Sequence, residues 1–333
     1  MTPQELHMNI TKERVLPLSF DGNKDFQSQK DNIRKKFIEL LGMPEKRTNP
    51  KPIIEYEKLS HECYDEIRFH FESEPNFYVP AHLILPKERL EKLPTVICLQ
   101  GHSSGMHRSL GRVKYTGDTE GDVGDRAFAL QAVKRGYACV IMELRGFGEL
   151  KGNEQDGGTN CLHMSMQALM LGRTLLGERC FDVSRLIDTL EYFKEVDLSR
   201  VGIMGNSGGG TTSFYAACVE PRIKVCMPSC SFCPYYESII SIHHCSCNYI
   251  PNILEYMEMQ DVSILIAPRP LVIVAGKEDD IFPIEGVKRG FETVKKIYKE
   301  LDADDNCQLI IGDGGHRFFA NISWPVFDKF LNT

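Results

Sequence analysis

Between Ile53 and Leu85, hydrophobic and polar residues alternate with a period of two, as in the run IRFHF at residues 67–71. Successive side chains of a strand point to opposite faces, so this alternation predicts strands with one face on the core and the other in water. The run from Val79 to Leu85 follows the same rule. We therefore expect an antiparallel meander with one wet face.

The pattern changes after Pro94, where the predicted strands become continuous apolar runs. Strands without alternation are typical of a parallel sheet that helices cover on both faces. The runs are VICL (96–99), ACVIM (138–142), VGIM (201–204), VCM (225–227), LVIVA (271–275) and QLII (308–311). Helical segments fall between them, which predicts an α/β fold with a mostly parallel central sheet flanked by helices and the meander along one edge.

Helical periodicity is clearest in three segments. Residues Phe26–Leu41 are followed by Gly42, a residue that commonly ends helices. An apolar face repeats every three to four residues from Val287 to Tyr298. The last helix is expected to begin at Ser323, as its N-cap, with Pro325 in the first turn.

The run VGIM is followed by the motif G-x-S-x-G at residues 205–209 and then by a helical segment. A serine at so tight a turn has an unfavourable backbone conformation, and side chains two residues to either side would collide with the strand or the helix. The helix also directs its free N–H groups and positive dipole end at the reacting centre. Ser207 is therefore the candidate nucleophile.

A serine hydroxyl becomes an effective nucleophile when a base accepts its proton and a carboxylate orients that base. Candidates for both roles follow the next two strong strands. Asp279 and Asp280 come after LVIVAG, and His316 comes after QLII. Because the carboxyl ends of parallel strands lie along one edge of a sheet, we expect an aspartate and His316 to meet Ser207 there.

These segments resemble the α/β-hydrolase superfamily, and more narrowly the branch that holds acetyl xylan esterases and dienelactone-hydrolase-like proteins. The resemblance covers most of the chain from about residue 50. It rests on LQGHSSG (99–105), VDLSRVGIMGNSGGG (196–210), LIAPRPLVIVAGKEDDIFPIEGV (265–287) and GGHRFF (314–319). It implies the α/β-hydrolase fold, with a catalytic domain over residues 51–333 and an N-terminal helical extension over residues 1–50.

In α/β hydrolases the triad follows the chain order serine, acid, histidine, which Ser207, the aspartate pair and His316 reproduce. The loop pattern G-x-x-D-x-x-x-P, matched by residues 276–283, places Asp279 at the acid position. We therefore expect Asp279 to orient His316, and Asp280 is the alternative.

Acyl transfer also needs hydrogen-bond donors where the carbonyl oxygen becomes negative. One should be the backbone N–H of Gly208, directly after the nucleophile. The other is expected from the LQGHSSG turn, where the backbone N–H of His102 follows Gly101, a residue that lets the chain approach closely. A side-chain role for His102 is the less favoured alternative.

The resemblance implies a serine carboxylesterase that hydrolyses small acyl esters, often acetyl groups on sugars or oligosaccharides, without a cofactor. The chain departs from dienelactone hydrolases proper, whose nucleophile is cysteine, and this argues against a lactone substrate. A serine peptidase of the prolyl-oligopeptidase type would use the same triad. That class usually carries a large gating domain, for which the first ~90 residues are too short.

The chain contains 12 cysteines, several of them within apolar runs. Because the chain is long and lacks secretory features, we expect most of them to be reduced and buried. A dense group of thiols and imidazoles lies between the serine and acid strands and comprises Cys226, Cys230, Cys233, His243, His244, Cys245 and Cys247. It suggests a third alternative, a metal-binding or redox-sensing protein. Its spacing lacks the paired C-x2-C arrangement of structural zinc sites, so no metal is expected.

Other features have weaker functional signals. Either His243 or His244 is a candidate for lining the substrate site, and Arg145 is expected to form structural ion pairs. Two long loops, 101–124 and 146–160, follow strands at the edge where open α/β sheets form a ligand crevice. Five other histidines lack the sequence context of His316 and are expected to be solvated or structural, namely His7, His61, His70, His82 and His107.

Composition narrows the class of partner. The 39 Lys and Arg against 46 Asp and Glu give a net charge of −7, which argues against nucleic acid and anionic membrane as partners. No run approaches the ~18 apolar residues of a membrane span, and the first residues lack the apolar core of a secretory signal. We expect a cytoplasmic enzyme with a small-molecule ester substrate, and the sequence is compatible with a homo-oligomer.

Overall fold

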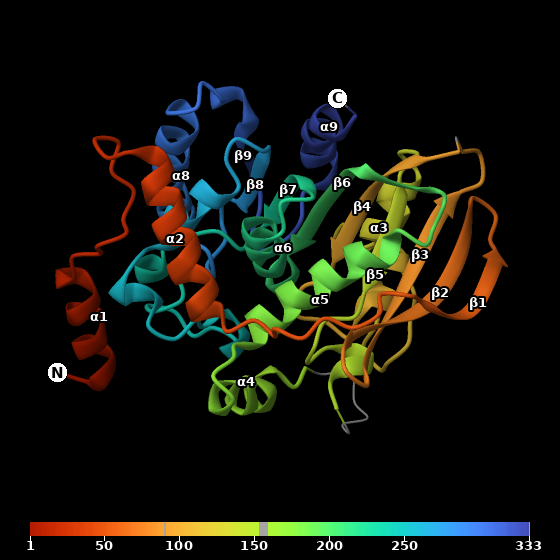
Figure 1. Ribbon diagram of the computed structural model, residues 1–333, viewed down its shortest axis with the longest axis horizontal. Coiled ribbons are helices and arrows are strands. Elements are labelled where there is room, and N and C mark those ends of the chain that lie inside the picture. The colour runs from red at the N-terminus through yellow and green to blue at the C-terminus, as the bar shows by residue number, and fades with distance from the viewer. Residues whose placement is uncertain (90, 153–158, 333) are drawn as a thin grey trace.

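The continuous apolar runs form the centre of a nine-stranded sheet in the computed structural model, which describes residues 1–89, 91–152 and 159–332. The strand order is β1-β2-β3-β5-β4-β6-β7-β8-β9 (Figure 1). From β5 to β9 along this order, neighbouring strands are parallel. These strands are β4 (Leu93–Leu99), β5 (Ala138–Met142), β6 (Val196–Asn206), β7 (Ile223–Ser229), β8 (Leu271–Gly276) and β9 (Cys307–Gly312). The predicted mostly parallel sheet is confirmed.

The alternating segment forms the antiparallel edge of this sheet, as predicted. It folds into β1 (Ile53–Ser60), β2 (Tyr64–Glu74) and β3 (Phe77–Pro86). β3 then pairs antiparallel with β5 and joins the meander to the parallel strands. A shift of one residue would exchange buried and exposed faces, so the hydrophobic pattern specifies this register.

The expectation of one wet face is wrong for β3. His82 and Ile84 lie on the face predicted to be wet, yet they are only 5% and 0% exposed. β3 lies inside the sheet, and Ile84 packs in the same hydrophobic cluster as Phe128 of α3 (Phe128–Val133). The second face is dry because this helix covers it.

Helices cover both faces of the sheet and divide the core into two clusters. The larger cluster includes side chains of α2 (Phe26–Leu41), α5 (Leu175–Leu190), α6 (Gly208–Val219) and α8 (Ile284–Lys299), and Figure 1 is viewed from the side of α2, α5 and α6. The second cluster includes α3 and α9 (Ala320–Leu331). The short helices α4 (Cys161–Met170) and α7 (Met259–Val262) lie in the segments after β5 and β7.

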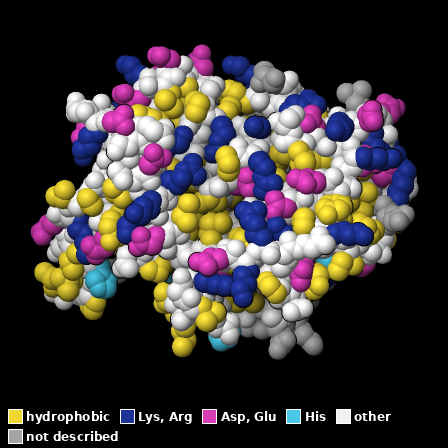
Figure 2. Space-filling view, in the orientation of Figure 1, with side chains coloured by type: hydrophobic (Ala, Val, Ile, Leu, Met, Phe, Trp, Pro, Cys, Tyr) yellow, Lys and Arg dark blue, Asp and Glu magenta, His cyan; other side chains and the backbone are white. Residues whose placement is uncertain are grey.

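Basic and acidic side chains are interspersed over the face in Figure 2, with hydrophobic side chains between them. None of the helices in the described ranges combines the length and the apolar character needed to cross a bilayer.

The last helix begins earlier than predicted. α9 starts at Ala320, so the expected N-cap, Ser323, lies within the helix, and Pro325 follows in its interior. Ser323 and Trp324 are both fully buried, and the Trp324 ring packs edge-on against Phe327. Burial of this aromatic side chain outweighs the helical hydrogen bond that a proline cannot donate.

The first fifty residues contribute unequally to the core. α1 (Pro3–Glu13) buries none of its residues and lies at the periphery of the molecule in Figure 1. α2 has the predicted bounds and places Ile33, Phe37 and Leu41 in the larger cluster. The rings of Phe37 and Tyr215, in α6, lie 5.3 Å apart. The division at residue 50 remains a prediction, and α2 shares its core with the sheet.

Candidate active site

Ser207 lies at the turn between β6 and α6, in a strained backbone conformation. Its φ of 54° and ψ of −123° lie in a region that costs a residue with a side chain ~1–3 kcal/mol. A Cβ added at Gly205 would lie 2.5 Å from the carbonyl oxygen of Gly209, and one at Gly209 would lie 2.2 Å from that of Leu99. The two outer glycines of the motif are therefore sterically required, as predicted.

The loops after β8 and β9 meet at the same edge of the sheet. His316 Nδ1 lies 2.9 Å from Asp279 Oδ2. The other carboxylate oxygen of Asp279 accepts the backbone N–H groups of Ile281 at 2.9 Å and Phe282 at 3.0 Å. Asp280 is exposed. The geometry thus pairs His316 with Asp279 rather than with Asp280.

The surroundings of Asp279 favour its ionised form. Burial alone would raise its pKa, but the hydrogen bond and charge of His316, together with the N–H groups of Phe282 and Ile281, hold the pKa below its usual range. The Phe282 ring also stacks on the imidazole, with the two centroids 6.0 Å apart. A carboxylate fixed in this way can orient an imidazole and stabilise its protonated form.

Ser207 and His316 line one small pocket of about 50 Å³. Its other lining residues are Gln100, Gly101, His102, Ser103, Arg126, Phe128 and Asn206. Among the hydrogen bonds of the described residues, none joins the Ser207 hydroxyl to His316. Such bonds often tighten only when substrate is bound. The structure brings the predicted residues to one pocket, and transfer of a proton from Ser207 to His316 remains a prediction.

The loop after β4 packs against the turn that carries Ser207. A Cβ at Gly101 would lie 2.7 Å from the carbonyl oxygen of Asn206, and one at Gly208 would lie 2.9 Å from Nδ1 of His102. The other ring nitrogen of His102, Nε2, lies 3.2 Å from Cys247 Sγ. Gly101 and the ring of His102 therefore lie against the turn of Ser207, and the backbone N–H groups of His102 and Gly208 remain predicted oxyanion donors.

A larger cavity of about 630 Å³ adjoins this pocket and shares His102, Ser103 and Arg126 with it. Its remaining lining is mostly polar and comprises Ser104, Arg108, Thr116, Gly117, Asp118, Thr119, Val123, Gly124 and Thr159. The loop 101–124 thus lines a crevice, as expected. Part of the loop 146–160 lies outside the described residues.

Asp118 is a buried charge in the wall of this larger cavity. Its carboxylate accepts the Ser104 hydroxyl and the backbone N–H groups of Lys114 and Tyr115, each of the last two at 2.9 Å. His107 Nε2 lies 2.7 Å from the same carboxylate. Burial would raise the pKa of Asp118, but these hydrogen bonds lower it. His107 is thus structural, as predicted.

Two other histidines and Arg145 also have structural partners. His61 Nε2 and His82 Nδ1 lie 2.8 and 2.6 Å from the carboxylate of Glu66. The guanidinium of Arg145 donates to the Asp182 carboxylate at 2.8 and 2.7 Å. The prediction of a structural ion pair for Arg145 is confirmed.

Neither His243 nor His244 is among the described residues that line the two cavities. His243 is exposed. His244 is buried, its Nε2 lies 2.9 Å from Ser238 Oγ, and its ring packs edge-on against Phe282. Burial lowers the pKa of His244 to about 4. The expected contact with substrate is thus replaced by packing behind the ring that supports His316.

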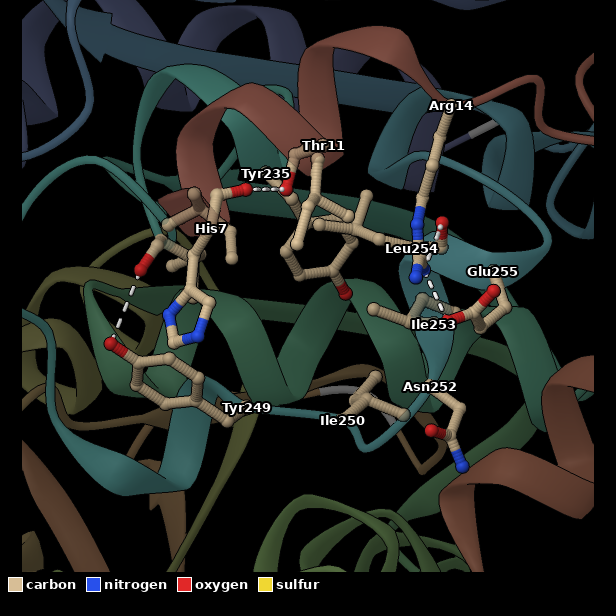
Figure 3. A pocket seen from close by; sticks show the side chains of 13 residues that line it. His7, Thr11, Arg14, Tyr235, Tyr249, Ile250, Asn252, Ile253, Leu254 and Glu255 are labelled. Carbon is tan, nitrogen blue, oxygen red and sulfur yellow. Dashed lines mark hydrogen bonds and ion pairs between the residues drawn. The ribbon is translucent and has the colours of Figure 1, made fainter. Parts of the chain in front are cut away.

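A pocket of about 320 Å³ lies between α1 and the segment 235–255 (Figure 3). In this pocket Arg14 forms an ion pair with Glu255, and the Tyr249 hydroxyl donates to the carbonyl oxygen of Ile239 at 3.1 Å. None of its described lining residues is a serine or a cysteine. The small pocket at Ser207 is therefore the better candidate for acyl transfer.

Two residues lie beside the triad although the sequence analysis did not place them there. The thiol of Cys230 lies within 4.8 Å of the ligand atoms of Asp279 and His316. Its position directly after β7 was a usable signal, because the other triad segments also follow strands. Arg126 had no local signal, since it reaches the pocket only through the path of the loop after β4.

Comparison with known proteins supports the fold. The model of the Abhydrolase family matches residues 17–311. The chain is similar to "Putative hydrolase YtaP" of Bacillus subtilis (strain 168), with 23% identity over 287 residues that cover 85% of this chain and 92% of that protein.

Solved structures of similar shape include a "putative acetyl xylan esterase" from Bacteroides fragilis NCTC 9343, with a TM-score of 0.82, 16% identity, and coverage of 99% of this chain and 95% of that one. A glucuronoyl esterase from Solibacter usitatus has a TM-score of 0.69 and 15% identity, over 96% of this chain and 97% of that one. At such identities these structures support the fold alone. Together with the match over residues 17–311, they show that the chain belongs to the Abhydrolase family and has the α/β-hydrolase fold.

Proposed function

We propose that the protein is a serine carboxylesterase with Ser207, His316 and Asp279 as its triad. Ser207 attacks the ester carbonyl while His316 accepts its proton and passes it to the leaving alcohol. A water molecule activated by His316 then releases the acid from the serine. The N–H groups of His102 and Gly208 hold the oxyanion.

The observation that carries this proposal is the arrangement around one pocket. The imidazole of His316, whose Nδ1 lies 2.9 Å from Asp279 Oδ2, lines the same pocket as Ser207. Ser207 has a positive φ and lies at a strand-to-helix turn. Surface serines have no need of a strained backbone and two sterically required glycines. The arrangement is the one that nucleophilic acyl transfer requires.

The size of the pocket favours a short acyl group. This pocket has a volume of about 50 Å³, against about 630 Å³ for the cavity that adjoins it, so a short acyl group fits beside Ser207 better than a long chain does. Acetyl and other short esters are therefore the proposed substrates.

The neighbouring cavity favours a polar alcohol. Its lining supplies hydroxyl groups, the buried carboxylate of Asp118 and the guanidinium groups of Arg108 and Arg126. These groups can form hydrogen bonds with sugar hydroxyls. The name of one similar structure, a putative acetyl xylan esterase, supports an acetylated sugar or oligosaccharide. The free thiols of all 12 cysteines support the expected cytoplasmic location.

The test is hydrolysis of p-nitrophenyl acetate by the wild type and by Ser207→Ala. We expect the variant to lose at least ~10⁴-fold in kcat with an unchanged thermal unfolding curve, because the nucleophile alone is removed. Ser213→Ala, a buried serine of α6 that does not line the pocket, is the matched control and should keep wild-type turnover.

Two outcomes would contradict this proposal. Retained turnover in Ser207→Ala would reject the mechanism. Cleavage of aminoacyl amides without cleavage of acetyl esters would favour a peptidase. Across p-nitrophenyl esters of increasing acyl chain length, kcat/KM should be highest for short acyl groups and should fall for longer ones, since the pocket at Ser207 is small.

A further inference from the structure

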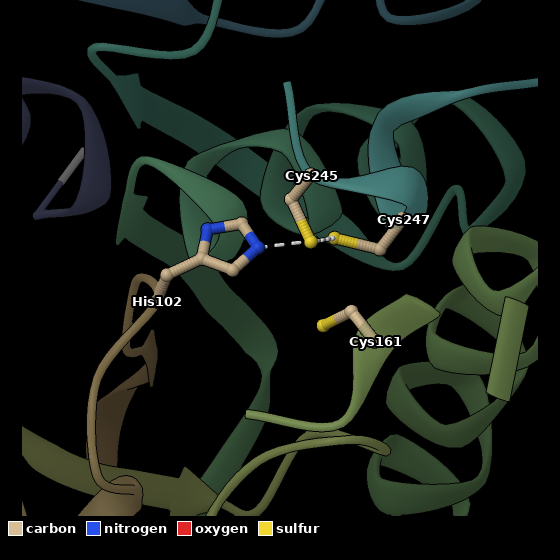
Figure 4. A group of neighbouring side chains, drawn as sticks. All are labelled: His102, Cys161, Cys245 and Cys247. Carbon is tan, nitrogen blue, oxygen red and sulfur yellow. Dashed lines mark hydrogen bonds between the residues drawn. The ribbon is translucent and has the colours of Figure 1, made fainter. Parts of the chain in front are cut away.

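Three cysteines and one histidine converge beside the catalytic pocket (Figure 4). They come from separate segments: His102 from the loop after β4, Cys161 from the start of α4, and Cys245 and Cys247 from the segment between β7 and α7. One ring nitrogen of His102 and the three sulfur atoms all lie within 4.8 Å of one another. Figure 4 shows the four side chains directed at a common space.

The spacing of these atoms fits a tetrahedral zinc ion. With Zn–S bonds of about 2.3 Å and Zn–N bonds of about 2.0–2.1 Å, two sulfurs lie about 3.8 Å apart and a sulfur lies about 3.6 Å from the nitrogen. Here the Cys245 and Cys247 sulfurs are 3.5 Å apart, and His102 Nε2 lies 3.2 Å from Cys247 Sγ. These two pairs would separate by a few tenths of an ångström to admit the ion, and all other pairs of the four atoms lie within 4.8 Å. Three thiolates and one imidazole are also ligands that zinc prefers.

A buried cation lies next to this group. Arg179 of α5 is 1% exposed, and its Nη2 lies 3.3 Å from Cys161 Sγ. Its Nε and Nη2 also donate to the carbonyl oxygen of Arg145 at 3.0 and 2.6 Å. Within the part of the chain that the structure describes, no carboxylate forms an ion pair with Arg179. A buried charge needs a charge of opposite sign close by. Zn²⁺ with three thiolates and a neutral imidazole carries one negative charge, which this guanidinium would balance.

We propose that His102, Cys161, Cys245 and Cys247 bind one zinc ion. All four ligands come from the protein, so the ion has no open position for a water molecule and acts as a structural clamp. The N–H···S contact from Arg179 is the kind of outer interaction that orients and neutralises a thiolate ligand. The site binds metal whether or not the chain is an esterase.

The remaining cysteines of the dense sequence group lie elsewhere. Cys226 Sγ donates to the carbonyl oxygen of Ser213, and Cys230 Sγ donates to that of Arg317. Cys233 packs against Gly286, where an added Cβ would lie 2.6 Å from its sulfur. The spacing argument against a zinc site therefore addressed the wrong set of residues, because two of the proposed ligands come from outside that group.

The proposed ion would connect three segments that surround the catalytic pocket. His102 lies on the loop that packs against the turn of Ser207, and its ring touches Gly208. Cys161 begins α4, and the segment with Cys245 and Cys247 also carries His244, which packs behind Phe282. Zinc at this point would hold the proposed oxyanion loop in place without taking part in the chemistry.

The test is the zinc content of the full-length protein, purified without added metal and measured by plasma mass spectrometry. We expect about one zinc per chain in the wild type and at least a tenfold loss in Cys161→Ala and Cys247→Ala. Cys233→Ala removes an equally buried thiol outside the site and should keep the wild-type content.

A second readout uses the wild type alone and needs no variant to fold. A chelator strips the protein of metal, and cobalt(II) is then titrated in. The expected result is a thiolate-to-cobalt charge-transfer band together with the strong visible bands of tetrahedral cobalt, saturating at about one ion per chain. Zinc below about 0.1 per chain with no charge-transfer band would overturn the proposal. Wild-type zinc content in both cluster variants would also overturn it.

Discussion

Asp279 and Asp280 are neighbours in the chain with opposite surroundings. The Asp279 side chain is fully buried and holds both the His316 imidazole and two backbone N–H groups, whereas Asp280 is exposed. The path of the loop after β8 decides which carboxylate faces inward. Only a carboxylate in contact with the imidazole can select its tautomer and stabilise its charged form.

This contrast predicts very different effects of two similar substitutions. Asp279→Asn should lower kcat for p-nitrophenyl acetate by ~10⁴-fold, because the amide cannot stabilise the imidazolium. Asp280→Asn should stay within about threefold of the wild type, since a solvated carboxylate contributes little. The reverse order of the two kcat values would contradict the assignment.

How far single residues could be predicted depends on where their partners lie. Ser207, Asp279 and His316 were accessible from the sequence because each directly follows a predicted strand, and strand ends share one edge of the sheet. Cys161 and Arg179 carried no such signal, because their neighbours belong to distant segments. For His244 the sequence indicated the right region but not the direction of the side chain, which packing against Phe282 decides.

At the scale of elements, a buried carboxyl group joins the ends of β4 and β5. Glu143, 1% exposed, follows β5, and its two oxygens accept the N–H groups of Met106 and Glu149, each at 3.1 Å. A Cβ at Gly105 would lie 2.7 Å from one of these oxygens. Glu143 thus holds the loop that carries His102 against the loop after β5.

Burial raises the pKa of Glu143 from 4.5 to about 7. Because this pKa lies above the value in the unfolded chain, the stability that Glu143 contributes is complete in acid and is lost as the pH rises through about 7. We expect the free energy of unfolding to fall less between about pH 5 and about pH 8 in Glu143→Gln than in the wild type, as measured by urea denaturation.

Glu220→Gln is the matched control for this measurement, because Glu220 is another buried glutamate, 5% exposed. Hydrogen bonds from Arg222 and Ser184 outweigh burial and lower the pKa of Glu220, so this group does not titrate in the same range. Its variant should keep the wild-type fall in stability. An equal fall in Glu143→Gln and the wild type would show that Glu143 does not titrate there.

Elements were predicted well where one hydrophobic period dominated. The parallel strands and α2 follow the sequence pattern, and Gly42 ends α2 in the left-handed conformation expected of such a residue. β3 and the start of α9 were misjudged for a shared reason. Burial of Ile84 beside α3 and of Trp324 in the second core cluster depends on tertiary packing, which local periodicity does not contain.

At the scale of the whole molecule, the core does not stop at residue 50. Phe37 of α2 is completely buried and lies against Tyr215 in the helix that follows the nucleophile. Ile10 of α1 is 41% exposed. The two N-terminal helices therefore differ in how they contact the rest of the molecule, although the division of the chain at residue 50 groups both of them in one extension.

Alanine substitutions distinguish these two relations. Phe37→Ala should lower the free energy of unfolding by ~3–5 kcal/mol, because it leaves a cavity in the main core. Ile10→Ala should lower it by less than ~0.5 kcal/mol, because the side chain is largely solvated. Urea denaturation measures both values. A loss below about 1 kcal/mol for Phe37→Ala would support a separate extension.

The central claim is that Ser207 is the group that attacks the ester. The most direct measurement is reaction with a fluorophosphonate, followed by peptide mass spectrometry to locate the phosphonyl group. We expect about one adduct per chain, on the peptide that contains Ser207, with ester turnover lost in proportion to labelling. Turnover that persists when Ser207 is fully labelled, or inactivation with the adduct on a different residue, would contradict the account.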